Sequence, residues 1–299
     1  MNTYRIKLTP RSLWATPWHA DTLFAALCWQ VVLTGGEGRL IEILDDFRRG
    51  EPPFVLSDAF PDGWYPCPLT ARVEQLPEVK TKRPGWVSEA QFRALLSGCG
   101  KLLAETQPFE PFAQSSQLHA SINRLTGTTT PGGQLFEVET WAIRSSAVKT
   151  LSLYVRTQDL LDEFVSLLRS LSFVGFGKKR SSGLGAFEVV GDPEPCPWMD
   201  ETEGADAFVS LSHFVPSVGD PTDGRWSLLT KYPKFSPGVP GSLVFKGRLT
   251  MLRPGSVFRF GESWRPFYGR MLTNLAEDFP QAVHYALAFP VPMRWPRES

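Results

Sequence analysis

The sequence predicts a protein of the α+β class. Three observations lead to this prediction. An alternating apolar pattern over residues 4–9 precedes a segment whose apolar residues recur at helical spacing. A second amphipathic segment, 158–171, lies between two short strand patterns. From about residue 205 the chain contains mainly strand patterns separated by loops. The 299 residues suffice for two domains of ordinary size.

The helices of the first half have recognisable start and stop signals. Asp21 is predicted to be the N-cap of the first helix, which should end at Gly35-Gly36. A second short helix should cover about 38–49. Ser88 is the predicted cap of a further helix over 88–103.

Residues 115–145 are predicted to form a long β-hairpin that projects from the body of the protein. Two extended runs flank an uncharged, glycine-rich tip at 125–133. A strand over 150–156, the helix at 158–171 and a strand near 184–190 follow. Strand, helix, strands, helix, strand is the order of a ferredoxin-like (RRM-like) domain.

Two domains are expected along the chain. The N-terminal domain covers residues 1–192, and a proline-containing, acidic segment over 193–204 is predicted to be a linker. The C-terminal α+β domain covers 205–299, with one helix near 267–278. Its strands are expected at 207–214, 225–232, 242–252 and 283–290.

Composition excludes several classes of protein. The net charge is zero, which argues against a protein that coats nucleic acid with its whole surface but allows a local basic track. No apolar run is long enough for a membrane span, and the N-terminus lacks a signal sequence, so a cytoplasmic location is expected. The four scattered cysteines indicate reduced thiols, and the ten tryptophans are expected mainly in the core. Neither a metal nor a cofactor is predicted.

The segment 173–187 is the most informative motif of the chain. It contains four glycines, Gly175, Gly177, Gly183 and Gly185, around Lys178, Lys179, Arg180, Ser181 and Ser182. Glycines allow backbone N–H groups to approach an anion, and cations and hydroxyls suit phosphate. No carboxylate occurs between Glu163 and Glu188. The motif therefore predicts a loop that binds backbone phosphate, with an ordinary solvated turn between helix and strand as the alternative.

The first run of the predicted hairpin carries polar candidates. Alternation places His119, Ser121 and Asn123 on one face, where they can hydrogen-bond bases or 2′-hydroxyls. Ala120 and Ile122 should then point to the core. Arg124 has the opposite parity but lies at the base of the tip, within reach of a phosphate. The alternative is the polar solvent face of an edge strand.

His19 and Asp21 lie at the start of the first helix. A metal site or an acid–base pair is one interpretation, but a helix cap beside a loop histidine is the simpler one. Backbone N–H groups at this helix start can also bind an RNA phosphate. None of the four histidines has a cysteine or carboxylate at metal-ligand spacing.

Three stretches together resemble the RAMP superfamily of CRISPR RNA-binding proteins, and within it the family of the fourth subunit of the type III-A (Csm) effector complex. They are His19–Cys28 with Gly50–Pro61, His119–Gly127 with Gln134–Glu139, and Phe173–Gly185. The second half agrees at Val209–Pro216, Gly255–Phe258, Tyr268–Leu272 and Val283–Phe289. The resemblance therefore spans nearly the whole chain, although the glycine loop alone is typical only of the superfamily.

This resemblance implies two ferredoxin-like domains that hold the 5′ repeat-derived tag of a crRNA. It implies contacts with the large polymerase-like subunit and with the first backbone RAMP subunit, and it implies no catalytic activity. The hairpin would be a "thumb" that wedges into the guide–target duplex, by shape and apolar insertion. Its candidate residues are Leu125, Thr126, Thr128, Pro131 and Gln134. A merely disordered loop is the alternative for this tip.

An enzymatic function is the competing hypothesis. A RAMP endoribonuclease that processes crRNA would use His19 or His119 as general acid or base.

Overall fold

The structure of the protein is a computed structural model. It describes residues 1–73, 82–99, 101–102, 109–120, 122, 125–129, 135–144, 148–235, 245–261, 263–275, 279 and 281–296.

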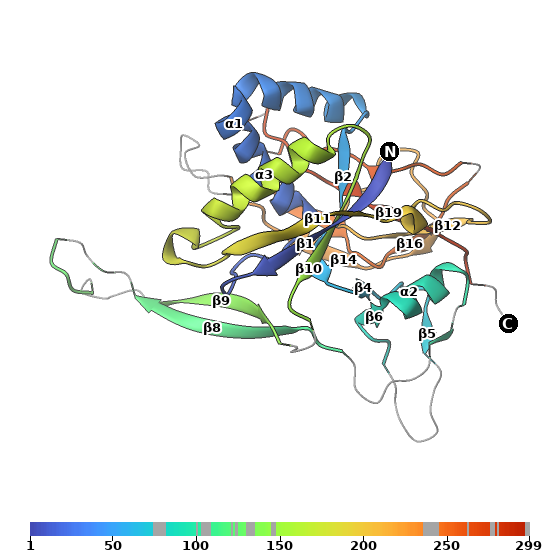
Figure 1. Cartoon of the computed structure of the whole chain (residues 1–299), viewed down its shortest axis with the longest axis horizontal. Coiled ribbons are helices and arrows are strands. Elements are labelled where there is room, and N and C mark those ends of the chain that lie inside the picture. Colours follow the sequence, from blue (N-terminus) through green and yellow to red (C-terminus); the bar gives the residue numbers. More distant parts are fainter. Residues whose placement is uncertain are drawn as a thin grey trace.

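An antiparallel sheet forms the centre of the first half (Figure 1). Its strands are, in spatial order, β11 (Phe187–Pro195), β1 (Asn2–Pro10), β10 (Leu151–Thr157) and β2 (Phe54–Leu56), and β3 (Phe60–Pro61) also pairs with β10. Strand β1 pairs with β10 from Asn2 opposite Thr157 to Leu8 opposite Leu151. All seven residues of β10 are buried, so both faces of this sheet are covered.

Helices cover one face of this sheet. They are α1 (Ala20–Arg49) and α3 (Leu161–Val174), and Arg39 of α1 forms an ion pair with Glu163 of α3 at 2.7 Å. Gly36 interrupts α1 with φ 80°, and Gly50 ends it in the left-handed conformation. The two glycines lie at the two helix ends that the sequence predicted. Glycine occurs at such ends because it adopts a positive φ at little cost.

A small subdomain lies beyond the edge of the sheet. It contains β4 (Trp64–Pro66), β6 (Trp86–Ser88), α2 (Glu89–Leu96), β5 (Arg72–Val73) and β7 (Lys101–Leu102). Ser88 is the N-cap of α2, as predicted, and forms a capping box with Gln91. The helix ends at Leu96, earlier than predicted.

The predicted hairpin is confirmed as β8 (Phe112–Ala120) paired with β9 (Leu135–Ile143). It projects from the body of the molecule (Figure 1). The prediction that Ala120 and Ile122 point to the core is wrong, because both are exposed. At this distance from the sheet the hairpin has no core of its own to bury them.

The second half packs its own sheet against the other face of the first one. The order is β13 (Gly224–Arg225), β16 (Val257–Arg259), β12 (Ala207–Ser210) and β19 (Pro290–Met293). Two further strand pairs are β14 (Leu228–Lys231) with β15 (Leu249–Leu252), and β17 (Tyr268–Gly269) with β18 (Leu287–Ala288). Val209 and Val291 share an apolar cluster with Val55 and Tyr154 of the first sheet.

The helix expected near 267–278 is wrong for the residues that are described there. Tyr268–Gly269 is strand β17, and Leu272 bridges to His284. Across the described residues of 205–299 the chain contains strands and no α-helix. The ferredoxin-like character of this half therefore stays a prediction.

The segment predicted as a linker, 193–204, packs closely against the first sheet. It contains the end of β11 and a 3₁₀ turn, η2 (Pro197–Met199). The Asp200 carboxylate accepts hydrogen bonds from the Thr3 N–H at 2.9 Å and from Nε of the buried Arg156 at 2.9 Å. Arg156 also donates to the Pro290 carbonyl at 3.0 Å, so this guanidinium joins the two halves. No helix formed by the described residues is both long and apolar enough to cross a membrane.

Candidate nucleic-acid interface

The glycine loop joins α3 to β11 and packs tightly against the segment that joins β1 to α1. Gly177 has φ 87°, and a Cβ atom there would lie 2.5 Å from Cβ of Thr16. Gly185 has φ 75°, and its Cβ atom would lie 1.9 Å from the Phe176 carbonyl oxygen. These two positions therefore require glycine for both conformation and space.

Several amides of the loop donate to acceptors within the protein. The Lys178 N–H donates to Oγ1 of Thr16 at 2.9 Å. Ser182 and Leu184 donate to the Lys179 carbonyl at 2.9 and 3.3 Å, closing the 3₁₀ turn η1 (Arg180–Ser182). Since these N–H groups are occupied, the capacity of the loop to bind an anion rests mainly on its side chains.

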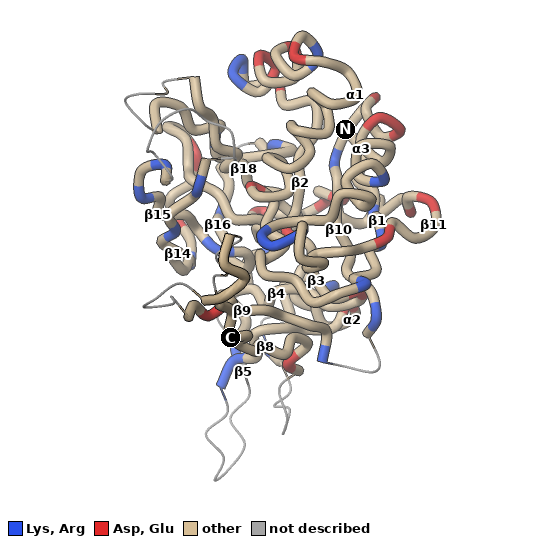
Figure 2. The backbone as a smooth tube through the Cα atoms, turned by 90° about the vertical axis from the view of Figure 1, so that its left-hand side faces the viewer, with Lys and Arg blue, Asp and Glu red and all other residues tan. Residues whose placement is uncertain are grey.

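The cationic side chains of the loop are available for such a role. Lys178, Lys179 and Arg180 are all exposed, as are Ser181 and Ser182. None of the three cations forms an ion pair with the part of the chain that the structure describes. Lys179 adopts φ 60°, which is uncommon for a side-chain-bearing residue and turns the chain sharply. Figure 2 shows Lys and Arg in small groups over the molecule rather than on one continuous basic face.

The loop and the hairpin, predicted separately, contact each other. Nζ of Lys179 lies 4.6 Å from the ring centroid of Phe136 in β9. The His119 imidazole stacks on the same ring, with centroids 5.6 Å apart and 17° between the planes. His119 Nε2 is buried and has no hydrogen-bond partner among the described residues. The contact brings the predicted hairpin site and the predicted phosphate site together.

The tip of the hairpin is described only in part. Leu125 is 96% exposed, and the hydroxyls of Thr126 and Thr128 lie 3.0 Å apart. The other candidates of this region lie outside the described residues: Ser121, Asn123, Arg124, Pro131 and Gln134.

The prediction that Asp21 caps the first helix is wrong. His19 is the N-cap residue, and the Ala20 N–H donates to Oδ1 of Asp58 at 2.8 Å. Asp21 is buried within the first turn and forms an ion pair with Nζ of Lys231 at 2.6 Å. Burial alone would raise the pKa of Asp21, but His284 and Lys231 hold it far below its ordinary value. Asp21 therefore ties α1 to the second half.

Sequence analysis missed a cluster in which His19, Asp58 and His213 meet. Nδ1 of His213 lies 2.6 Å from Oδ2 of Asp58, and the rings of His19 and His213 have centroids 4.2 Å apart. Burial lowers the pKa of His19 to about 4. The three residues come from distant parts of the chain, so no spacing in the sequence signals them.

Ligand atoms of these three residues lie within 4.8 Å of one another, which is close enough to hold a metal ion. Two features oppose that use. Both oxygens of Asp58 already accept hydrogen bonds, from Ala20 and His213. In addition, the Lys231 ammonium lies 3.5 Å from Nδ1 of His19 and would repel a cation.

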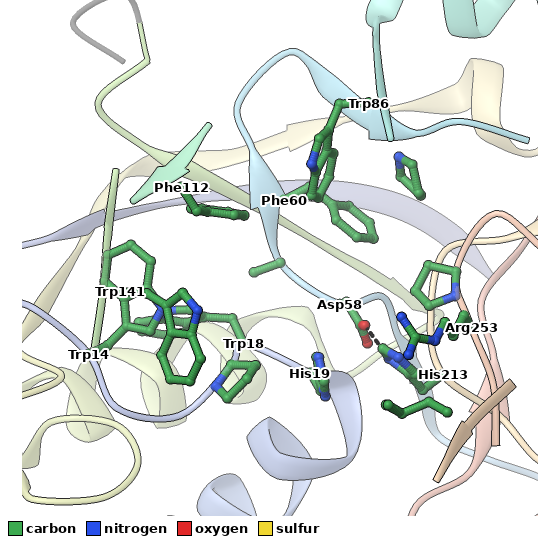
Figure 3. A pocket seen from close by; sticks show the side chains of 15 residues that line it. Trp14, Trp18, His19, Asp58, Phe60, Trp86, Phe112, Trp141, His213 and Arg253 are labelled. Atoms are coloured by element: carbon green, nitrogen blue, oxygen red, sulfur yellow. Dashed lines mark hydrogen bonds and ion pairs between the residues drawn. The ribbon is translucent and has the colours of Figure 1, made fainter. Parts of the chain in front are cut away.

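This cluster forms one side of a pocket of about 360 Å³ between the two halves of the chain. Six aromatic side chains line the pocket: Trp14, Trp18, Phe60, Trp86, Phe112 and Trp141. Figure 3 shows the indoles of Trp14, Trp18 and Trp141 on one side and the histidines with Arg253 on the other. The expectation that tryptophans mainly fill the core thus overlooked this cavity.

Comparison with known proteins identifies the family. No protein-family model matches the sequence. A Streptococcus thermophilus protein named CRISPR system Cms protein Csm4 is 30% identical over 283 residues, which cover 88% of this chain and 86% of the relative. The chain belongs to the Csm4 family. The resemblance seen in the sequence motifs is thereby confirmed.

Solved structures share the fold of this Csm4-family chain. A chain of the crystal structure of a Csm1-Csm4 cassette in complex with pppApA matches with a TM-score of 0.63 and 18% identity, over 99% of this chain and 100% of that one. A chain of the Csm3-Csm4 subcomplex in the type III-A CRISPR-Cas interference complex matches with a TM-score of 0.60 and 13% identity, over 97% and 99%.

Proposed function

We propose that this Csm4-family chain is a non-catalytic crRNA-binding subunit of a type III-A CRISPR effector, which holds the 5′ repeat-derived tag. The observation that carries the proposal is the contact between Lys179 and Phe136. Through it, three exposed cations, none of which forms an ion pair with a described residue, lie beside the far end of the two strands of a projecting hairpin. Cations bind ribose-phosphate chain without reading sequence, which suits a constant tag. A stacked His119–Phe136 pair beside them suits contact with bases.

The architecture proposed for this role has two parts. The strand order of the first sheet, with α1 and α3 on one face, supports a ferredoxin-like RAMP domain. The β8–β9 hairpin is proposed as the thumb, because apolar side chains such as Leu118, Leu125 and Leu135 stand exposed along it. Exposed apolar side chains on a projection can wedge between bases of a guide–target duplex.

The proposed protein partners are the large polymerase-like subunit and the backbone RAMP subunit. Support comes from the names of the related structures, which pair Csm4 with Csm1 in one case and with Csm3 in the other.

A second candidate, a crRNA-processing endoribonuclease, is favoured by the two imidazoles that lie side by side. General acid–base catalysis works best when the pKa of the group lies near the working pH. Burial lowers the pKa of His19 to about 4, which makes this imidazole a poor proton donor and a weak base at neutral pH. We therefore propose the binding role and treat the nuclease as its competitor.

The binding role is tested by the salt dependence of crRNA affinity. Replacing Lys178, Lys179 and Arg180 by Ala should make the plot of log affinity against log salt shallower by about 2, since each phosphate contact on a single strand contributes roughly 0.7. A triple variant with the same charge change, R48A/R49A/R169A, is the control, because these cations already pair with acids. An unchanged slope in the loop variant would refute phosphate binding there.

The competitor is tested by incubating the protein with repeat RNA in EDTA. The proposal expects intact RNA. Metal-free cleavage that disappears in His19→Ala or His119→Ala would establish the nuclease instead.

A further inference from the structure

The pocket between the two halves has polar groups whose protonation is fixed by their neighbours. Oδ2 of Asp58 lies 2.6 Å from Nδ1 of His213, while Oδ1 accepts the Ala20 N–H. Burial would raise the pKa of Asp58, but His213 and the other neighbours hold it below its ordinary value, so the carboxylate is an acceptor only. His213 must therefore carry a proton on Nδ1. In its neutral form it offers Nε2 as a hydrogen-bond acceptor.

His19 has the opposite arrangement. Its Nδ1 lies 3.5 Å from the ammonium of Lys231, which can only donate. The imidazole is neutral at pH 7, so its proton belongs on Nε2, which makes Nε2 a donor. The two rings, 4.2 Å apart, thus place the Nε2–H donor of His19 next to Nε2 of His213, which is an acceptor in the neutral imidazole.

We propose that this pocket receives one unstacked nucleobase of the bound RNA. The inference rests on the proposed function and adds a ligand class and a position to it. The Watson–Crick edge of every base has a donor next to an acceptor, as adenine N6 and N1 or uracil N3 and O4 do. The edge of a base can therefore pair with His19 and His213 at once, and the aromatic walls supply stacking surface.

Further groups of the pocket fit such a ligand. Nε1 of the buried Trp18 has no hydrogen-bond partner among the described residues, so its N–H can donate to an acceptor on a ligand. The Arg253 guanidinium is exposed at the rim. Among the described residues it donates through Nε, to the Leu228 carbonyl at 2.9 Å, and its terminal nitrogens can reach a phosphate. A volume of about 360 Å³ lies at the lower end of small-molecule sites.

The pocket adjoins the proposed phosphate-binding loop. Trp18 stacks on Phe176 of that loop, with ring centroids 4.4 Å apart. The Lys178 N–H bonds to Thr16, two residues before Trp18. An RNA backbone that follows the cations of the loop therefore passes close enough to turn one base inward. An apolar side chain of a protein partner would instead leave the donor and the acceptor unpaired, which is costly once water is excluded.

The test uses the effector complex assembled with crRNAs that each carry one abasic nucleotide, scanned through the tag and the adjoining guide. One position should lose affinity by roughly tenfold, as expected for one stacked base. In the pocket variant Trp141→Leu, or Trp86→Leu if the first fails to fold, that position-specific loss should disappear. The control is Trp226→Leu, which removes an exposed indole outside the pocket. In this variant the abasic position should still lose affinity as it does in the unaltered complex.

The outcomes separate this inference from the proposed function. Equal losses at every position, or a loss that persists in the pocket variant, would overturn the base pocket while leaving tag binding intact. Pocket variants that impair subunit assembly without changing the abasic profile would assign the pocket to a protein side chain and equally overturn it. Absence of any crRNA retention by the unaltered protein would refute the proposed function itself.

Discussion

Replacement of His19 by Gln should change how stability depends on pH. Burial lowers the pKa of His19 from 6.5 to about 4, so the folded protein resists protonation of this ring. Between pH 6.5 and pH 4 the unfolded chain binds a proton at His19 that the folded chain does not. Stability from this group is therefore complete above pH 6.5 and is lost as the pH falls towards 4. Glutamine does not titrate, so the variant should lack this loss.

The size of this loss of stability follows from how far the pKa of His19 is lowered. The difference of about 2.5 pKa units, at 1.36 kcal/mol for each unit, gives about 3 kcal/mol across this window. The buried carboxylates of Asp21 and Asp58 do not contribute to the loss of stability in this pH window. The pKa values of Asp21 and Asp58 are lowered, so their stabilising contributions are lost only below their ordinary value of 3.8.

Urea denaturation, followed by tryptophan fluorescence at pH 7, 6, 5 and 4, measures this effect. The difference in the free energy of unfolding between wild type and variant at pH 7 gives the cost of the substitution. That difference should shrink by about 3 kcal/mol, or reverse, by pH 4. Parallel pH profiles for the two proteins would show that His19 is not a half-buried imidazole held neutral by its surroundings.

Three further substitutions test the packing around the site. Gly185→Ala should cost about 3 kcal/mol, because the new Cβ would lie 1.9 Å from a backbone carbonyl oxygen. Gly183→Ala has open space around it and should cost only about 1 kcal/mol, the cost of a positive φ. The urea midpoints of the two variants measure this difference. Lys231→Met should destabilise by about 1.5–3 kcal/mol, because the buried Asp21 carboxylate loses its ammonium partner and keeps the His284 imidazole at 3.0 Å, and adding Asp21→Asn should restore part of that loss in the same assay. Ser88→Ala should cost about 1 kcal/mol in thermal unfolding by removing the capping box, and an unchanged midpoint would contradict the cap.

The sequence predicted those features that are determined by neighbouring residues. The break of α1 at Gly36, the cap at Ser88 and the antiparallel hairpin all follow from local backbone preferences. Helix capping was mispredicted at Asp21 because the acceptor is supplied by Asp58, a residue 38 positions away from Ala20. A carboxylate in the first turn looks the same in sequence whether it caps the helix or pairs with Lys231.

The candidate site was predicted in pieces and missed where it depends on tertiary contacts. The glycine loop was identified from its composition. Its amides donate to Thr16 and to loop carbonyls, and these hydrogen bonds depend on packing that composition does not show. The cluster of His19, Asp58 and His213 unites three distant parts of the chain, and the sequence offers no spacing to detect it. The helix expected near 267–278 failed because apolar spacing in a short segment does not distinguish a helix from the strand and bridge that pair with 284–288.

The segment between β1 and α1 connects all parts of the candidate interface. Trp14 exchanges backbone hydrogen bonds with Trp141 at the base of the hairpin, at 3.1 and 2.8 Å. Thr16 accepts a hydrogen bond from the glycine loop, Trp18 stacks on that loop, and His19 contacts His213 of the second half. Hairpin, cationic loop and pocket are thus positioned by a single short connection. Because buried contacts of this kind resist independent displacement, the three elements keep one relative arrangement, and an RNA bound as proposed would meet them at constant spacing.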